Sequence, residues 1–531
     1  LTPKRNKQGT KINEHSPNTS GKPAIKSTET TKTEVTPMAR NSTPSYTIEF
    51  PLRIPLWQQH RLEKRFKIAR IIYNSCLGEA LKRHRAVKAS KEYRLLLKEP
   101  TSGERSKQLA EIRLAYGFTE YSMYKFVKPM QHKFKEHIGS HEAQKLATRA
   151  FQAVEKLHYG QAKKVNFKSV HDDISVENKS NKHGLRYNDG CITWGKKPTK
   201  KNPKPKNWLC MPIEPKPKDE YAHLALLDKT KYVRILKREI RGKTRYFVQL
   251  IQEGYPPTKQ NRKISNDETK RVGLDIGTST IAIASKDKVE LRELAPACTV
   301  DERELRRIQR KMDRSKRATN ANNFNENGTV KKGRLTWRYS KKYKKLRQKQ
   351  KELYRKISIQ RRMSHEKLAN DILALGSDVR VETMRFQSLQ KRAKNTTRNK
   401  RNGKINRKKR FGKSIANRAP AMLITIINRK LGYQGRSIKK IDTFATKASQ
   451  FNHTTGEYSK KQLSDRWNDI EGLPIQRDLY SAFLIGNTKD TLNSVDVDLC
   501  NAQWDCFVEL HNREIARIKQ LHSKTLRWFI A

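Results

Sequence analysis

The chain has 531 residues, and its 116 Lys and Arg against 52 Asp and Glu give a formal net charge of +64. That length exceeds a single hydrophobic core and predicts about three or four structural units. Positive charge in such excess indicates a polyanionic partner, nucleic acid first, and argues against a small-molecule enzyme. The densest apolar run, residues 421–427, is too short to span a membrane, so no membrane partner is expected.

No signal peptide precedes the first expected domain, which predicts a reducing, cytoplasmic location in a prokaryotic cell. Residues 1–45, rich in Lys, Thr, Ser and Pro, predict a disordered basic tail, and the natural start is expected at Leu1 or Met38. The six cysteines form no C-x-x-C pair, so we expect ordinary buried thiols rather than a disulfide framework. A monomer is expected.

Residues 46–256 predict a mixed unit of strands and helices. Residues 46–54 alternate as a strand does, and Leu62, Phe66 and Ala69 begin an apolar stripe at helical spacing. Basic helices continue to about residue 157. Strands are then expected at residues 165–168, 184–187 and 191–194, and in a hairpin that pairs residues 233–236 with 246–251. A β-barrel with helices inserted at about residues 57–157 fits this pattern, and a polar linker follows at residues 256–267.

Residues 271–285 read RVGLDIGTSTIAIAS, which predicts two strands joined by a tight turn at residues 277–279. One carboxylate, Asp275, stands alone in this apolar run. An ionised Asp buried without a partner is costly, so it should either accept hydrogen bonds from the turn amides or bind a cation. The local sequence leaves both open.

Two further acids stand alone in basic surroundings. Residues 377–384 predict a short strand that ends near Glu382, and residues 475–485 predict a helix with Asp478 in its first turn. Carboxylates from separate elements can converge to hold two Mg²⁺ ions, which activate water on one side of a phosphodiester and stabilise the leaving oxygen on the other. Sequence spacing alone leaves this convergence open.

Candidate nucleic-acid contacts lie on three basic stretches. Residues 301–370 predict two basic helices with too few acids to pair their charges, although a solvated pair of surface helices is the alternative. Residues 391–410 contain eleven Lys or Arg and no acid, so this loop should be ordered only by a phosphate backbone. The candidates are Arg61, Arg65, Arg70, Arg307, Arg310, Lys311, Arg314, Lys316, Lys341, Lys344, Arg392, Arg401, Lys408 and Arg410.

The motifs and their order resemble those of the split RuvC nuclease of TnpB transposon proteins and their type V CRISPR relatives. The matching segments are GLDIG at residues 273–277, VRVE at 379–382, TKASQ at 446–450 and RDLYSAFLI at 477–485. Tyr73, Asn74, residues 167–169 and SHEKL at 364–368 also follow the family pattern, so the resemblance covers about residues 46–490.

The resemblance implies a bilobed α/β multidomain fold. A wedge β-barrel with an inserted helical recognition domain would be followed by a split, RNase H-like RuvC domain with basic helical insertions. The wedge would span residues 46–256, and RuvC would be split into residues 268–300, 371–443 and 475–490. The basic helical insertion would be residues 301–370. A degenerate zinc-ribbon lobe that binds target nucleic acid would be residues 444–474, and a C-terminal helical tail would be residues 491–531.

The resemblance assigns Asp275, Glu382 and Asp478 as catalytic, Mg²⁺-binding acids, and it implies guide RNA and target double-stranded DNA as partners. Two departures stand near the third acid. Tyr480 replaces the usual Asn, and residues 446–456 carry no cysteine, so no zinc is expected and packing must stabilise that lobe, through Phe451, Tyr458 and Trp467. Asp496 and Asp498 are the fallback for the third acid.

The expected function is therefore an RNA-guided DNA endonuclease that recognises a short target-adjacent motif and cuts with RuvC. A guide-directed DNA-binding regulator without cleavage is the alternative. An actin-fold ATPase or kinase is more remote, because GLDIGT at residues 273–278 resembles its first phosphate loop but no second loop follows. A structural RNA-binding protein is a further alternative.

Overall fold

The computed structural model describes residues 43–531 except 171, 173, 196–198, 201–206, 258–264, 266, 268, 300–301, 392–394, 400–402, 404, 407–410, 461, 463 and 464. The expected tail therefore lies almost wholly outside the described residues. So do four of the candidate nucleic-acid contacts, Arg392, Arg401, Lys408 and Arg410, and much of the linker at residues 256–267.

Two open sheets and six helices make up the described part of residues 43–256. The four-stranded antiparallel sheet has the order β1-β7-β6-β2, and the other has the order β3-β4-β5. The strands are β1 Ser45–Leu52, β2 Ser175–Glu177, β3 Arg186–Asn188, β4 Cys191–Trp194, β5 Leu209–Pro212, β6 Thr230–Ile240 and β7 Lys243–Glu253. The helices are α1 Leu56–Ala89, α2 Lys91–Leu96, α3 Gly103–Ala115, α4 Glu120–Lys133, α5 Ser140–His158 and α6 Glu220–Leu227.

The expected barrel is not closed in the described residues. β1 and β2 are the edge strands of the larger sheet, and no described strand joins them. The expected strand at residues 165–168 is irregular backbone instead. The expected hairpin of β6 and β7 is confirmed, and its turn residues Arg241 and Gly242 both have positive φ, 51° and 76°, as a tight two-residue turn requires.

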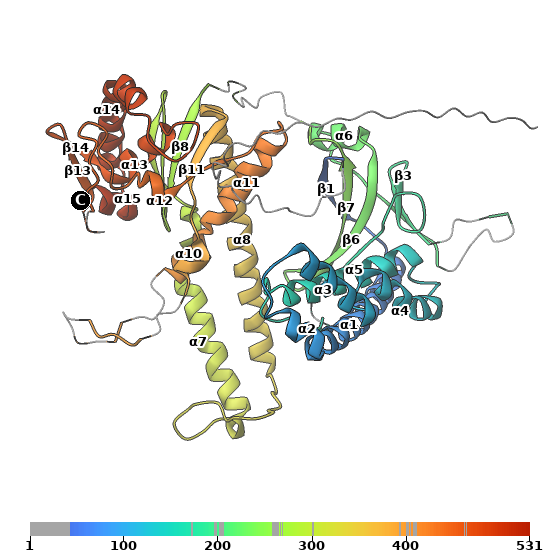
Figure 1. The fold of residues 1–531 in the computed structure, drawn as a ribbon. Coiled ribbons are helices and arrows are strands. Elements are labelled where there is room, and N and C mark those ends of the chain that lie inside the picture. The colour runs from blue at the N-terminus through green and yellow to red at the C-terminus, as the bar shows by residue number, and fades with distance from the viewer. Residues whose placement is uncertain are drawn as a thin grey trace, which may run out of the picture. The chain divides into compact units, whose positions relative to one another are not determined.

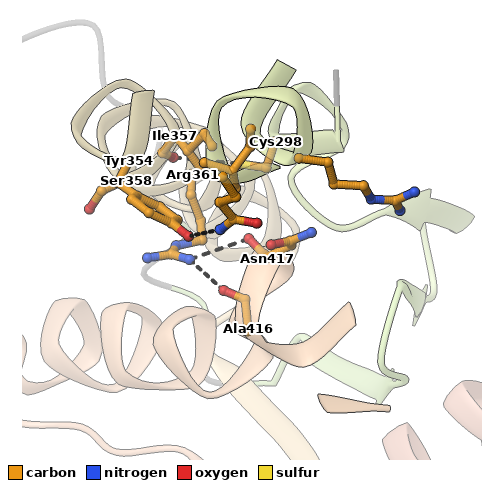
Figure 2. A pocket seen from close by; sticks show the side chains of 10 residues that line it. Cys298, Tyr354, Ile357, Ser358, Arg361, Ala416 and Asn417 are labelled. Atoms are coloured by element: carbon orange, nitrogen blue, oxygen red, sulfur yellow. Dashed lines mark hydrogen bonds between the residues drawn. The ribbon is translucent and has the colours of Figure 1, made fainter. Parts of the chain in front are cut away.

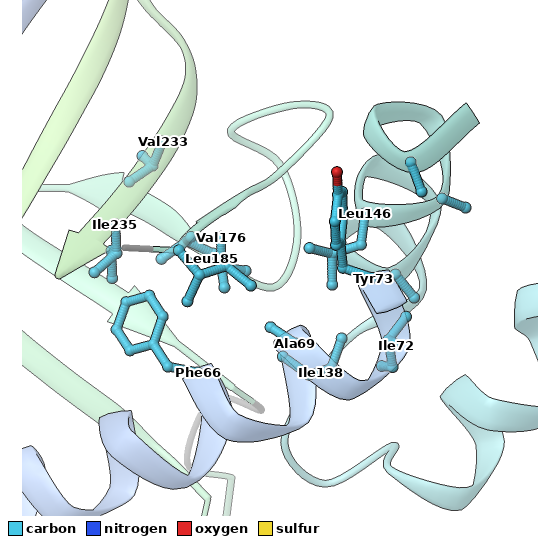
Figure 3. Packing of buried hydrophobic residues seen from close by; sticks show 14 of the residues in the cluster. Phe66, Ala69, Ile72, Tyr73, Ile138, Leu146, Val176, Leu185, Val233 and Ile235 are labelled. Carbon is cyan, nitrogen blue, oxygen red and sulfur yellow. The ribbon is translucent and has the colours of Figure 1, made fainter. Parts of the chain in front are cut away.

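The core of this region lies where α1 packs against α5 and the larger sheet. The apolar stripe of α1 is buried as the sequence predicts, with Leu62 and Ala69 fully enclosed. Figure 3 shows Phe66 of α1 directed toward Leu185, Val176 and Ile235. Motif residues that lie far apart in the sequence also meet here, because the Asn74 amide and the Lys168 backbone exchange two hydrogen bonds of 2.9 and 2.8 Å.

A five-stranded mixed sheet of order β10-β9-β8-β11-β12 organises the described part of residues 267–531. β10, β9 and β8 pair antiparallel, whereas β8, β11 and β12 pair in parallel. The strands are β8 Arg271–Ile276, β9 Thr280–Ser285, β10 Val289–Glu293, β11 Asp378–Glu382 and β12 Lys439–Ile441, with a separate hairpin of β13 Trp467–Ile470 and β14 Leu473–Gln476. The expected strands around Asp275 and Glu382 are thus confirmed.

Helices cover both faces of the mixed sheet. One face carries the bulky β-branched residues of β8 and β9 and packs on α8 Lys341–Leu375 and α11 Pro420–Gly432. The other face carries small residues, Gly273, Ala282 and Ala284, and packs on α13 Arg477–Gly486 and α14 Val497–Gln520. Because small side chains leave room for close approach, α13 lies directly on β8.

The remaining helices include a long basic pair. α7 Glu302–Thr319 and α8 run side by side in Figure 1 and share a small core of Ile308, Met312 and Leu353. The short elements are η1 Pro296–Thr299, η2 Ala321–Asn323, α9 Phe386–Leu389, α10 Gly412–Arg418, α12 Thr443–Thr446 and α15 Lys524–Ile530. None of the described helices is long and apolar enough to cross a membrane.

The cysteines differ in part from the prediction of buried thiols. Cys76, Cys298 and Cys500 are buried, but Cys210 and Cys506 are exposed. Cys210 lies on β5, a short edge strand whose outward positions face solvent, and this orientation explains its exposure.

Candidate active site

Two of the three predicted acids lie side by side on neighbouring parallel strands. The register pairs Val381 of β11 with Leu274 of β8, so the next residues, Glu382 and Asp275, stand at the same level. Alternate residues of a strand share a face, and Gly273 and Asp275 share the face that packs on α13. Both carboxylates therefore project from the carboxyl ends of adjacent strands toward α13.

The third acid comes from that helix. Asp478 lies in the first turn of α13, whose N-cap Gln476 accepts a hydrogen bond of 2.8 Å from the Leu479 amide. The chain that follows α13 is bonded to β11, the strand of Glu382, because the buried Arg380 of β11 donates a 2.7 Å hydrogen bond to Asp490. Arg380 also donates a 2.8 Å hydrogen bond to Asp378 on its own strand. We call Asp275, Glu382 and Asp478 the carboxylate cluster.

The cluster is electrostatically unfavourable when it is fully ionised. Burial raises the pKa of Asp275 well above its usual value, and the negative charges of Asp478 and Glu382 raise it further. Burial also raises the pKa of Glu382 and of Asp478, although Arg466 and Arg477 oppose the shift at Asp478. A carboxylate cluster that destabilises its own charges is typical of a functional site.

The turn-capping interpretation of Asp275 is wrong. Within the described residues, neither Asp275 nor Glu382 makes a hydrogen bond or an ion pair, and the Gly277 amide donates to Thr280 O at 3.0 Å instead. Both side chains nevertheless retain partial exposure to solvent. The carboxylates are therefore enclosed by protein but accessible from one side.

The donor set fits a hard divalent cation by its chemistry, since carboxylate oxygens are the ligands that Mg²⁺ prefers. Within the described residues Asp275 and Glu382 have no hydrogen-bond partner, whereas Asp478 has the Gln476 side chain. Among the described residues, no group of three or more His, Cys, Asp or Glu side chains is arranged so that it could hold a metal ion. Like charges repel at short range, so ionised carboxylates spread unless a cation draws them together. The cluster is thus a set of mutually interacting acids rather than a finished coordination shell.

Tyr480 does not face the carboxylate cluster. Two residues advance an α-helix by about 200°, so Tyr480 projects from the side of α13 opposite Asp478. Its ring is buried, and its hydroxyl accepts a hydrogen bond of 3.1 Å from the His453 amide. The same hydroxyl lies 2.7 Å from Nδ1 of His453 and can donate to a neutral ring.

This contact holds residues 444–474 on α13 and α14. His453 is buried, and its ring centroid lies 4.6 Å from that of Trp504. Phe451 is also buried, with its ring 4.9 Å from Tyr458, so the expected aromatic packing is present. The sequence interpretation missed His453, whose only local signal is that it lies within the degenerate zinc-ribbon segment.

Acid should weaken this contact. Burial lowers the pKa of His453 to about 4, below its ordinary value of 6.5. The unfolded state therefore binds more protons between these values, and stability falls by up to about 3 kcal/mol as the pH drops through that window. We expect proteolysis of residues 444–474 to be faster at pH 5 than at pH 7.5.

His453→Gln should flatten this pH dependence, whereas the matched change at the exposed residue, His522→Gln, should leave it intact. An equal response in both variants would contradict the assignment to His453.

Six of the predicted nucleic-acid contacts on α7 and α8 are exposed, as expected of a basic surface, and none forms an ion pair within the described residues. They are Arg307, Arg310, Lys311, Arg314, Lys341 and Lys344. Lys316 is partly buried and its Nζ lies 3.7 Å from the ring centroid of Trp337. Their contact with nucleic acid stays a prediction.

One of the predicted contacts is wrong. Arg65 is 1% exposed, stacks at 4.4 Å on the ring of Trp194 and donates a 3.2 Å hydrogen bond to the Trp194 carbonyl. It therefore stabilises the fold and is not available to phosphate. Arg61 donates to Trp208 O at 3.3 Å but keeps partial exposure, and Arg70 is also partly exposed.

Ser481 is a further candidate residue of the active site, and the sequence interpretation did not single it out. It lies one turn beyond Asp478, so both residues share a face of α13. Ser481 is 2% exposed, and its hydroxyl has no hydrogen-bond partner within the described residues. The i, i+3 spacing from Asp478 is the signal that could have found it.

A pocket of about 570 Å³ lies elsewhere, among η1, α7, α8 and α10. Figure 2 shows Arg361 directed toward the carbonyls of Ala416 and Asn417, where it donates hydrogen bonds of 2.7 and 3.4 Å. None of the three acids lines this pocket. This pocket is therefore separate from the carboxylate cluster, which lies at the carboxyl edge of the mixed sheet.

No protein-family model matches the sequence, and no curated protein matches it. Among solved structures, the chain is similar to a Cas12f1–sgRNA–target DNA complex, with 13% sequence identity, 85% of this chain and 99% of that chain covered, and a TM-score of 0.40. It is also similar to a CRISPR-Cas12f ternary complex, with 14% identity, 82% of this chain and 86% of that chain covered, and a TM-score of 0.21. Both neighbours are Cas12f complexes.

Proposed function

We propose that the chain is an RNA-guided DNA endonuclease whose carboxylate cluster cuts DNA with the help of Mg²⁺. The observation that carries this proposal is the convergence of Asp275, Glu382 and Asp478 from two parallel strands and one helix. The guide RNA and the target double-stranded DNA are the partners that the motifs and the net charge of +64 favour.

The topology of the sheet supports a RuvC-type nuclease. Numbered within the sheet in chain order, the strands have the order 3-2-1-4-5, with the first three antiparallel and the last two parallel to the first. This order places the carboxyl ends of the first and fourth strands next to each other at one edge of the sheet. Its first strand carries Asp275 and its fourth carries Glu382, and helix α13 supplies Asp478.

Each part of the site has a distinct role in this proposal. Asp275, Glu382 and Asp478 would hold Mg²⁺, which supplies charge stabilisation and an activated water for phosphodiester hydrolysis. Burial raises the pKa of Asp275 and of Glu382, and a bound cation would favour their ionised forms, so metal binding and catalysis are coupled. Arg380 and Gly273 position the strands and α13 but do not face the phosphate.

A guided DNA-binding regulator is the second candidate. Loss of the cysteines from residues 446–456 and the unusual Tyr480 favour it. The orientation of Tyr480 away from the cluster weakens this argument, because that residue leaves the three acids undisturbed.

The test uses the full chain with the RNA that copurifies with it. The RNA is sequenced, a labelled duplex that matches its variable segment is supplied, and cutting is followed in Mg²⁺ and in EDTA. We expect cutting in Mg²⁺ only, and duplex binding that falls by about 10³-fold or more between 50 and 200 mM salt. Guide-dependent binding without cutting would favour the regulator, and the absence of copurified RNA would reject both.

A further inference from the structure

Phe444 is the most exposed large hydrophobic side chain among the described residues, at 89% exposure. It lies in α12, directly after the edge strand β12. Single exposed hydrophobic side chains are common on protein surfaces, so the case for a partner rests on how Phe444 is held and on what surrounds it.

The backbone that carries Phe444 is fixed. Asp442 caps α12, because its Oδ1 accepts hydrogen bonds of 2.9 and 3.2 Å from the amides of Phe444 and Ala445. The Thr443 hydroxyl accepts a 3.1 Å hydrogen bond from the Thr383 amide, and the Thr383 hydroxyl donates to Ile441 O at 3.0 Å. Phe444 is therefore presented by a rigid support rather than by a loose loop.

That support adjoins the carboxylate cluster. Thr383, which holds Thr443, directly follows Glu382, and the register pairs Glu382 with Ile441, three residues before Phe444. The exposed ring thus stands at the same carboxyl edge of the sheet as the acids.

The residues near Phe444 indicate which kind of partner it would bind. Lys440 precedes it by four residues, Lys447 follows it by three, and both are exposed. An aromatic ring on a rigid support, with lysines close to it in the sequence, suits single-stranded nucleic acid, since bases stack on rings and phosphates meet positive charges. Of the two lysines, Lys447 also lies with its Nζ 5.6 Å from the ring centroid of Tyr458. An apolar peptide would gain nothing from the two lysines.

We propose that Phe444 stacks on a nucleobase of the single DNA strand that is led to the carboxylate cluster. The inference rests on the proposed function and adds a positioning residue to it. Stacking fixes the strand next to Glu382 without reading its sequence, because every base offers a π-face. Phe444 acts on the placement of the strand and does not itself touch the reacting phosphate.

The first test measures stacking without cutting. Guide-loaded protein in an Asp275→Asn background receives target DNA with 2-aminopurine at successive positions around the cleavage site. We expect fluorescence quenching at one position, lost in Phe444→Ala and restored in Phe444→Trp. Equal fluorescence in all three proteins would overturn the proposal, whether or not the wild-type chain cuts DNA.

The second test measures cleavage. Phe444→Ala should lower the cleavage rate about tenfold to hundredfold and leave guide and duplex binding unchanged, because one stacked base is lost. Phe444→Trp should retain the rate and Phe444→Leu should not. Full activity of the Leu variant would show that apolar bulk suffices and would reject stacking. The matched control, Tyr121→Ala, removes another exposed ring, 68% exposed on α4, and should change nothing.

Failure of the two hypotheses can be distinguished. If the wild-type chain does not cut but 2-aminopurine is quenched by Phe444, the nuclease proposal fails and the stacking site stands. If the wild-type chain cuts and Phe444→Ala cuts equally well, the stacking proposal fails alone.

Discussion

Asp275→Asn should abolish Mg²⁺-dependent cleavage, by about a thousandfold or more, while guide and target binding remain. The substitution keeps the shape of the side chain and removes one of the three acids that we propose as Mg²⁺ ligands. Charge stabilisation by a bound metal is worth several kcal/mol, and each 1.36 kcal/mol is about tenfold in rate. The measurement is the single-turnover cleavage rate of the guide-loaded protein, with target binding followed in parallel.

The same variant should not lose stability. Burial and the neighbouring acids raise the pKa of Asp275, so at neutral pH its ionised form opposes folding. A carboxyl with a folded pKa above its unfolded pKa destabilises the fold above that folded value, and the penalty disappears as the pH falls. In EDTA at pH 7.5 we therefore expect the Tm of Asp275→Asn to equal or exceed that of the wild type.

Added Mg²⁺ should raise the wild-type Tm and have little effect on Asp275→Asn, because a ligand stabilises only the state that binds it. A large loss of stability in EDTA would indicate instead that Asp275 has a structural role.

Asp496→Asn is the matched control. Asp496 caps α14 by accepting a 3.2 Å hydrogen bond from the Leu499 amide, a role that Asn performs equally well. We expect cleavage and stability to stay at wild-type levels. Loss of cleavage in Asp496→Asn with full activity in Asp478→Asn would transfer the third acidic position to Asp496.

Local sequence patterns predict the elements of the site because each depends on nearby residues. The strand around Asp275 and the apolar stripe of α1 follow from alternation and helical spacing, and both are present. The pairing of β8 with β11 joins residues more than a hundred positions apart, so the sequence order of the acids suggested their convergence only through the family resemblance.

The sequence-based predictions are wrong where a contact between residues far apart in the sequence determines the structure. Arg65 has the spacing of an exposed helical residue, but Trp194, 129 positions later, covers it. The expected barrel is not closed in the described residues, because closure requires the pairing of edge strands, which periodicity does not encode. The His453–Tyr480 hydrogen bond likewise joins two segments that the motif pattern treats separately.

Gly273→Ala should destabilise the mixed sheet and impair cleavage, although Gly273 contacts neither DNA nor metal. A Cβ at this position would lie well inside the van der Waals contact distance of the Ala482 carbonyl oxygen and 2.8 Å from Gly486 Cα. These are backbone atoms, which cannot rotate aside as a flexible side chain can. Overpacking typically costs about 1–3 kcal/mol, and we expect the upper end of that range or more.

The effect on activity follows from the position of α13. Relief of the clash requires α13 to move away from β8, and Asp478 moves with it, whereas Asp275 and Glu382 stay on their strands. Gly486→Ala tests the same contact from the other side, where an added Cβ would lie 3.1 and 3.4 Å from Gly273 N and Cα, so a smaller loss is expected.

The most discriminating result from these glycine variants is the order in which they lose stability and activity. Stability from urea unfolding and the cleavage rate should both decrease from wild type to Gly486→Ala to Gly273→Ala. Gly432→Ala at the end of α11, where an added Cβ would meet no atom within 4 Å, should lose neither. If Gly273→Ala kept full activity, close packing of α13 on β8 would not be what positions Asp478. Loss of activity at near-wild-type stability would instead show that a small displacement of that carboxylate suffices to disable the site.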